Sequence, residues 1–129
     1  MSAFSSALGV SASGLKAQAH RLRIVAENVA NTDTPGYQRK TVTFSTDVER
    51  SGLAKVALER VSLDPRSGES IYEPGHPMAD QSGHYTGSNV DLIIEIADAR
   101  EAQRSYEANL KLFDQTRQMS SGLMDLLRK

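Results

Sequence analysis

The sequence predicts a mainly α-helical protein in which two long terminal helices form an antiparallel coiled-coil pair, joined by a small loop-rich insert with a few short β-strands. Apolar residues recur at the alternating three- and four-residue spacing of a helix seam from about residue 5 to 30, and again from 88 to 129. The stretch between them holds three of the four prolines and only short β-prone runs. We therefore divide the chain into a helical segment 1–37, an insert 38–87 and a helical segment 88–129, with both helical segments forming one assembly domain.

The first predicted helix has a seam in which large residues alternate with alanine, so that a partner helix can approach closely. The large seam residues are Leu8, Leu15, Leu22 and Val29. Val10, Ile24 and Val25 lie off this seam and give the helix a second apolar flank. Because one partner cannot cover both flanks, we expect more than one neighbour around this helix in its working state.

This helix is predicted to end in the run that leads to Tyr37. Asn31 is suited to the left-handed conformation that closes a helix, and Thr34 precedes a proline, which pushes it out of the helical region. Pro35 and Gly36 suit the two central positions of a type II turn, where glycine supplies the positive φ. Tyr37 has a rigid ring with a polar tip, suited to packing where a helix meets a loop.

The insert is predicted to contain short strands separated by turns. Thr41–Phe44 alternates polar and apolar residues, and Val56–Val61 is a second candidate strand. A turn at Asp64–Gly68 precedes a short extended piece, Ile71–Pro77, which a Pro-Gly turn interrupts. The insert has too few apolar residues to form an independent domain.

The second helix is expected to begin at Ser88 as its N-cap, with Asp91 at the third helical position. Asp91, Glu95 and Asp98 then complement the helix dipole from its first turns. The seam keeps its three-four spacing as far as Phe113 and slips by one residue near Thr116, which locally overwinds a coiled coil. The large seam residues are Ile96, Tyr106, Leu110, Phe113, Leu123 and Leu126.

Composition excludes several classes of function. The 129 residues carry 15 basic and 16 acidic side chains, which argues against a nucleic-acid partner held by bulk positive charge. There is no cysteine, so the sequence offers no disulfide and no thiolate metal site. We expect no cleaved signal peptide, no direct membrane insertion, no nucleophile or phosphate-loop motif and no cofactor, and therefore no enzyme activity.

A metal-dependent enzyme is the alternative that His76, Asp80 and His84 leave open. Their four-residue spacing would place three ligands on one face of a helix. Pro74 and Pro77 disfavour a helix here, so we interpret the histidines as surface loop residues and predict no metal site.

Three motifs resemble those of the bacterial flagellar rod and hook family of axial proteins. The first consists of Asn28, Asn31, Thr34, Pro35, Gly36 and Tyr37. The second, at the start of the last helix, consists of Asn89, Val90 and Asp91. The middle motif is similar to that of one proximal rod subunit of the family and consists of Pro74, Gly75, His76 and Pro77.

The resemblance implies a structural subunit of the proximal rod of the flagellar basal body, in the periplasm. It implies export through the flagellar type III apparatus without a cleaved signal, helical assembly around the export channel, and transmission of motor torque. The implied partners are further copies, other rod proteins, adaptor proteins between the MS ring and the rod, and the export apparatus. Another rod subunit, or a coiled-coil adaptor or secretion-apparatus filament subunit, is the alternative.

Overall fold

The computed structural model describes residues 2–128 and consists of two long helices with two small sheets between them in the chain. The elements in order are α1 (Ser2–Ala30), β1 (Lys40–Val48), β2 (Ala54–Leu63), β3 (Ser70–Tyr72), β4 (His84–Thr86) and α2 (Leu92–Leu127). The coarse prediction of two terminal helices around a small stranded insert is confirmed.

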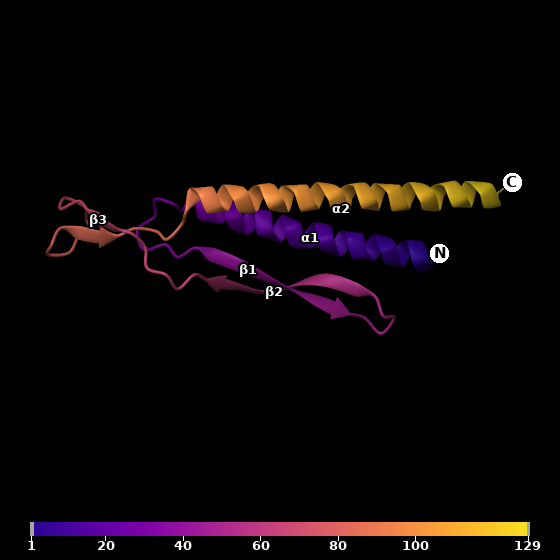
Figure 1. The fold of residues 1–129 in the computed structure, drawn as a ribbon, viewed down its shortest axis with the longest axis horizontal. Helices are drawn as coiled ribbons and strands as arrows, with labels where there is room; N and C mark the ends of the chain where they lie inside the picture. The colour runs from indigo at the N-terminus through magenta and orange to yellow at the C-terminus, as the bar shows by residue number, and fades with distance from the viewer. Residues whose placement is uncertain (1, 129) are drawn as a thin grey trace.

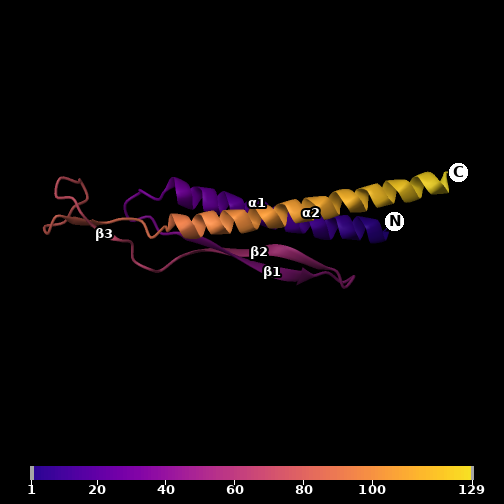
Figure 2. The same cartoon turned by 45° about the horizontal axis from the view of Figure 1, so that its top comes forward.

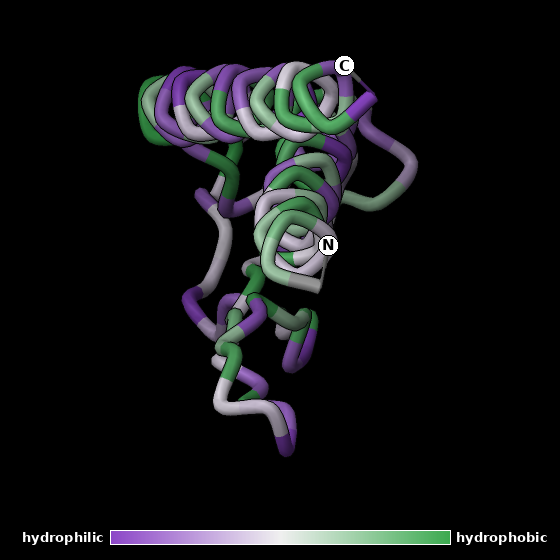
Figure 3. The backbone as a smooth tube through the Cα atoms, turned by 90° about the vertical axis from the view of Figure 1, so that its right-hand side faces the viewer, coloured by the Kyte–Doolittle hydropathy of each residue, from purple (hydrophilic) through white to green (hydrophobic). Residues whose placement is uncertain are grey.

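α1 is the middle layer of an elongated molecule. α2 runs along one side of it in the opposite direction, so that both termini lie at the same end (Figure 1). The two helices cross at a shallow angle, and α2 extends beyond the start of α1 (Figure 2). The hairpin of β1 and β2 lies along the other side of α1, which the end-on view shows as three successive layers (Figure 3). The β3–β4 pair projects at the end opposite the termini (Figure 1).

α1 ends without the predicted left-handed asparagine. Among residues 2–128 the positive φ values belong to glycines only, so that expectation for Asn31 is wrong. The side chain of Asn31 instead donates to the carbonyl of Glu27 at 2.9 Å, and its N–H is shared between the carbonyls of Glu27 and Asn28. The last turn therefore satisfies its own carbonyls, and no left-handed residue is needed.

The β1–β2 hairpin contains both predicted strands and extends them. It is antiparallel, with Lys40 opposite Leu63 and Val48 opposite Ala54. The register shifts between Thr43 and Phe44, which leaves Glu59 of β2 as an extra residue, a β-bulge. The predicted extended piece near residue 71 is also present as β3, which pairs with β4.

α2 begins three residues after the predicted start. Its N-cap is Asp91, whose carboxylate accepts from the N–H of Ile93 at 3.0 Å, so the assignment of Ser88 as N-cap is wrong. The hydroxyl of Ser88 is instead bonded to the carbonyl of Thr32, which holds the segment before α2 extended against the end of α1. Within residues 2–128, neither helix has an apolar stretch that would cross a membrane.

The helix pair has a small core. The buried apolar residues are Ala17, Ile24, Val25 and Ala102. The helices approach closely at Gly14, where a β-carbon would lie 3.0 Å from the carboxamide of Asn109. Small and polar side chains thus occupy much of the contact between α1 and α2, while many large apolar side chains lie outside it.

Candidate functional site

The carboxamide of Asn28 is the centre of a polar network that joins α1, β1 and α2. Asn28 is 1% exposed. Its Oδ1 accepts from the N–H of Lys40 at 2.9 Å and from the hydroxyl of Tyr37 at 2.8 Å. Its Nδ2 donates to the carbonyl of Lys40 at 2.9 Å and to Glu95 Oε2 at 3.3 Å. All four hydrogen-bonding positions of the carboxamide are occupied. Its two bonds to the backbone of Lys40 are those that a residue of a neighbouring strand would make.

A buried ion pair continues this network into α2. The Glu95 side chain is 0% exposed and accepts from Arg39 Nε as well as from Asn28. Asp98 forms an ion pair with Arg39 through Oδ2, at 3.5 Å, and a second ion pair with Arg21 of α1 through Oδ1. Burial lowers the pKa of Arg21, but the hydrogen bond and charge of Asp98 outweigh it and raise the pKa above its usual value. Because an unpaired buried charge costs several kcal/mol, these side chains hold α1, β1 and α2 together as one unit.

The side chain of Asn89 forms hydrogen bonds with the loops that lie beside the start of α2. Its Oδ1 accepts from the N–H of Arg39, and its Nδ2 donates to the carbonyls of Asp64 at 3.1 Å and Arg66 at 2.8 Å. Its own N–H donates to the carbonyl of Tyr37 at 3.2 Å. We use the name junction network for the side chains that meet here, which are Arg21, Asn28, Tyr37, Arg39, Asn89, Glu95 and Asp98.

The turn after α1 presents Tyr37 to the junction network. The N–H of Tyr37 donates to the carbonyl of Thr34 at 3.1 Å, and Gly36 has φ 73°, which confirms the predicted type II turn. The N–H of Gly36 donates to the carbonyl of Thr86 at 3.0 Å and thereby ties the turn to β4. Burial raises the pKa of the Tyr37 hydroxyl, and the charge of Glu27 adds to this.

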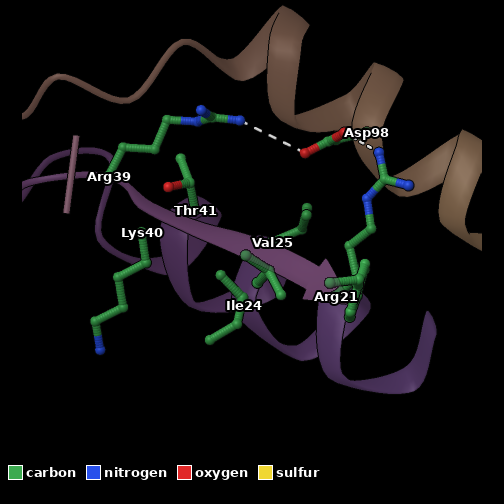
Figure 4. A pocket seen from close by; sticks show the side chains of 9 residues that line it. Arg21, Ile24, Val25, Arg39, Lys40, Thr41 and Asp98 are labelled. Carbon is green, nitrogen blue, oxygen red and sulfur yellow. Dashed lines mark hydrogen bonds and ion pairs between the residues drawn. The ribbon is translucent and has the colours of Figure 1, made fainter. Parts of the chain in front are cut away.

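A cleft of about 290 Å³ opens beside the junction network, between α1, β1 and α2. Ile24 and Val25 line it from α1, while Arg39 and Arg21 reach Asp98 from two sides (Figure 4). Ile24 and Val25 give the cleft an apolar floor, and each cation on its rim is paired with a carboxylate: Arg21 with Asp98, Arg39 with Glu95 and Lys40 with Glu27.

The middle motif forms the turn between β3 and β4. The N–H of His76 donates to the carbonyl of Glu73 at 3.0 Å across Pro74 and Gly75, and Gly75 has no positive φ, unlike Gly36. The ring of His76 stacks on Tyr85 with centroids 3.9 Å apart, while Pro77 is exposed.

The histidines of this turn have partners within the chain. His76 Nδ1 accepts from the N–H of Met78, and Asp80 accepts from Ser82 and from the N–H of His84. In the described part of the chain no three His, Cys, Asp or Glu side chains converge on a metal position.

The predicted seam residues lie around the rim and outside of the helix pair. Leu8, Leu15, Leu22, Tyr106 and Phe113 are half-buried. The other predicted seam residues, exposed by 41% to 68%, are Val29, Ile96, Leu110, Leu123 and Leu126. Each residue of an α-helix is rotated by about 100° from the one before it. The side chains of Leu8, Leu15, Leu22 and Val29 therefore point about 100° or more away from the buried side chain of Asn28.

The same geometry shows how the seams of the two helices are related. Gly14 lies beside Asn109 and Asn28 beside Glu95, so α1 and α2 have an antiparallel register. This register places the seam residues of α1 and α2 at matching levels along the helix pair. We use the name open stripe for these residues, which are Leu8, Leu15, Leu22, Val29, Ile96, Tyr106, Leu110 and Phe113.

The charged members of the junction network were missed by sequence reasoning. Glu95 and Asp98 were expected to complement the helix dipole, and no partner was predicted for either, whereas Glu95 is buried and paired with Arg39. The available signal was weak: Arg39 lies two residues after the turn, and Glu95 and Asp98 lie three residues apart on one helix face.

Two family models match the chain, and between them they cover six of the seven junction side chains. The model described as flagella basal body rod protein matches residues 8–38, and that described as flagellar basal body rod FlgEFG protein C-terminal matches residues 81–126. Flagellar basal-body rod protein FlgC of Agrobacterium fabrum is 43% identical over 99% of this chain and 98% of its own length. The FlgC proteins of Salmonella typhimurium and Buchnera aphidicola are 34% and 32% identical, each over 85% of this chain and over 87% and 88% of their own lengths.

Proposed function

The chain belongs to the FlgC family of flagellar basal-body rod proteins, and from this premise we propose how its structure serves the rod. It is a structural subunit of the proximal rod of the flagellar basal body, as its sequence motifs predict. The middle motif identified the member of the family correctly as rod protein C. The proposal concerns the surfaces that the rod uses and the point at which the chain folds.

The open stripe is the proposed surface for neighbouring subunits, together with Leu123 and Leu126 near the end of α2. Leu110 is 41% exposed and Ile96 50% exposed, although both belong to an apolar seam. Full burial of an exposed Leu or Ile is worth about 1.5–3 kcal/mol, so covering the exposed half of each such side chain gains about 1 kcal/mol. In the rod, the two helices of one subunit and those of its neighbours then pack as a coiled coil.

The size of the core is the observation that carries this proposal. Within residues 2–128, four small or medium apolar residues are buried, whereas nineteen large hydrophobic side chains are exposed. Ordering a residue costs about 1–2 kcal/mol of backbone entropy, which so small a core does not offset over two long helices. The terminal helices therefore fold as the subunit joins the rod, which suits a chain that leaves the cell unfolded.

The remaining parts of the proposal rest on family membership. Subunits pass through the flagellar type III export apparatus without a cleaved signal and assemble helically around the export channel in the periplasm. Their neighbours are further copies, other rod proteins and the adaptors between the MS ring and the rod. The antiparallel helix pairs then carry torque from the motor toward the hook.

Two experiments test this function. The first is mass spectrometry of purified hook–basal bodies beside the motility of a strain that lacks the chain. We expect the chain in the basal body and a rodless, non-motile mutant; absence of the chain with normal swimming contradicts the proposal. The second is circular dichroism and sedimentation of the isolated protein. A fully helical, compact monomer would show that folding does not depend on assembly.

A further inference from the structure

We propose that the free edge of β1 binds an extended segment of a different rod polypeptide, which joins the hairpin as a third strand. This inference rests on the proposed assembly of the chain into the rod. Residues in an antiparallel strand turn their N–H and C=O groups alternately toward the two edges. Bonds from the N–H of Asp64 to the carbonyl of Arg39 and from the N–H of Glu49 to the carbonyl of Leu53 show which residues of β1 face β2.

The residues between these two bonds alternate without interruption, because the extra residue of the bulge lies in β2. The residues that turn their backbone groups away from β2 are Lys40, Val42, Phe44, Thr46 and Val48. Lys40 is already bonded by the carboxamide of Asn28. Within residues 2–128, the described bonds give the other four no partner at this edge. The edge from Val42 to Val48 therefore offers four donors and four acceptors to an incoming strand.

The edge of β2 is protected, whereas that of β1 is not. Ser13 Oγ of α1 accepts from the N–H of Val56 at 3.2 Å, and the bulge and the charged side chains of Glu59 and Arg60 interrupt the same edge. Natural sheets use such bulges, charges and prolines to prevent unwanted pairing. Residues 41–46 of β1 contain no charged residue and no proline, and the extra residue of the bulge lies in β2; the first charged residue beyond them is Asp47, so the part of the edge from Val42 to Thr46 is available for a partner.

The surroundings of the edge define its occupant. The cleft of about 290 Å³ lies at the near end of the edge, and Val42 and Phe44 line it together with Ile24 and Val25. An added strand with apolar side chains at alternate positions would place one of them there. Pairing of β1 with β1 of a second copy would make a closed two-fold contact, which cannot propagate along a helical rod. Neither strand of a second copy's hairpin therefore fits this edge, β1 because of the symmetry and β2 because its own edge is protected, and we assign the edge to a segment of a different rod polypeptide.

Hydrogen exchange on basal bodies purified from cells tests this inference. The amides of β1 are followed at single-residue resolution by mass spectrometry. We expect the outward amides of Val42, Phe44, Thr46 and Val48 to be protected as strongly as the inward amides. Fast exchange at these four, beside slow exchange at Thr43 and Ser45, overturns the inference while the chain's presence in the basal body still supports the proposed function.

Proline substitution gives an independent test. Thr46→Pro removes an outward N–H and leaves the β1–β2 ladder intact, whereas Thr46→Val keeps that N–H and a similar shape. We expect at least about tenfold less assembled chain for Thr46→Pro and little change for Thr46→Val. Normal assembly of Thr46→Pro contradicts the inference. Since the chain has no cysteine, disulfide dimers of a Thr46→Cys variant in basal bodies would show that a second copy, not a different polypeptide, occupies the edge.

Discussion

The junction network and the open stripe are built from the same two helices, yet they satisfy their side chains in opposite ways. At the junction, Asn28 fills all four hydrogen-bonding capacities, and Glu95 is paired without any second molecule. Along the open stripe, Leu110 and Ile96 remain about half exposed. Polar contacts thus fix the register of the helices within one chain, and we propose that the exposed apolar side chains are left for its neighbours. Mutations in the two regions should therefore fail in different ways.

The largest effect is expected from a charge in the open stripe. Leu15→Asp or Leu110→Asp would bury a carboxylate between subunits without a partner, which costs several kcal/mol at every contact. We expect assembly into the rod to be abolished while the monomer stays soluble. Fractionation of basal bodies and motility in soft agar measure this. Ala108→Asp, an exposed change on another face of α2, is the control and should still assemble.

A change at the centre of the junction network is expected to lower the stability of the folded subunit without altering the open stripe. Asn28→Asp keeps the shape but loses both donated hydrogen bonds and places a second carboxylate against Glu95. We expect a loss of at least about 3 kcal/mol, seen as a lower urea concentration for dissociation of assembled rods.

Asn31→Asp is the matched control for this prediction, because it removes a single part-buried bond, that to the Glu27 carbonyl. Its loss should be about 1 kcal/mol. Equal urea midpoints for Asn28→Asp and Asn31→Asp would mean that the junction network does not fix the helix register.

The contrast between the two regions also explains what the sequence could predict. Periodicity reveals apolar residues whether or not a partner is present, so both helices and the two hairpin strands were predicted correctly, while the role of the seam residues stays a prediction. Periodicity cannot show which of two apolar flanks is covered within one chain, and here the flank with Ile24 and Val25 is the buried one. The bonds of Asn28 depend on residues up to 67 positions away, so no local pattern reveals them. Ser88 and Asp91 are both good caps, and only the contact of Ser88 with Thr32 decides between them.

The two Pro-Gly turns provide a smaller test within one chain. Gly36 has φ 73° and open space around it, so an alanine there meets no atom but must adopt a left-handed backbone. We expect Gly36→Ala to cost about 1–2 kcal/mol and to weaken assembly, and Pro35→Ala combined with it to let α1 extend further. Gly75→Ala, at a turn without positive φ, should be neutral. Wild-type swimming of the double variant would contradict the role of the first turn, as would an equal defect in Gly75→Ala.

The smallest effect is expected from removing one hydroxyl group of the junction network, that of Tyr37. Tyr37→Phe removes the hydroxyl that donates to Asn28 Oδ1 and leaves the other three bonds of the carboxamide, so we expect a loss of about 1 kcal/mol. The loss should depend on pH, because burial raises the pKa of Tyr37 above its usual 10.0. A raised pKa in the folded state stabilises the protein fully below pH 10, and this contribution disappears as the pH rises through the folded pKa. Urea dissociation of assembled rods at pH 8 and above pH 10 should therefore separate wild type from Tyr37→Phe at the lower pH and bring them together at the higher. A difference that stays constant with pH would show that the hydroxyl is not held in the junction network.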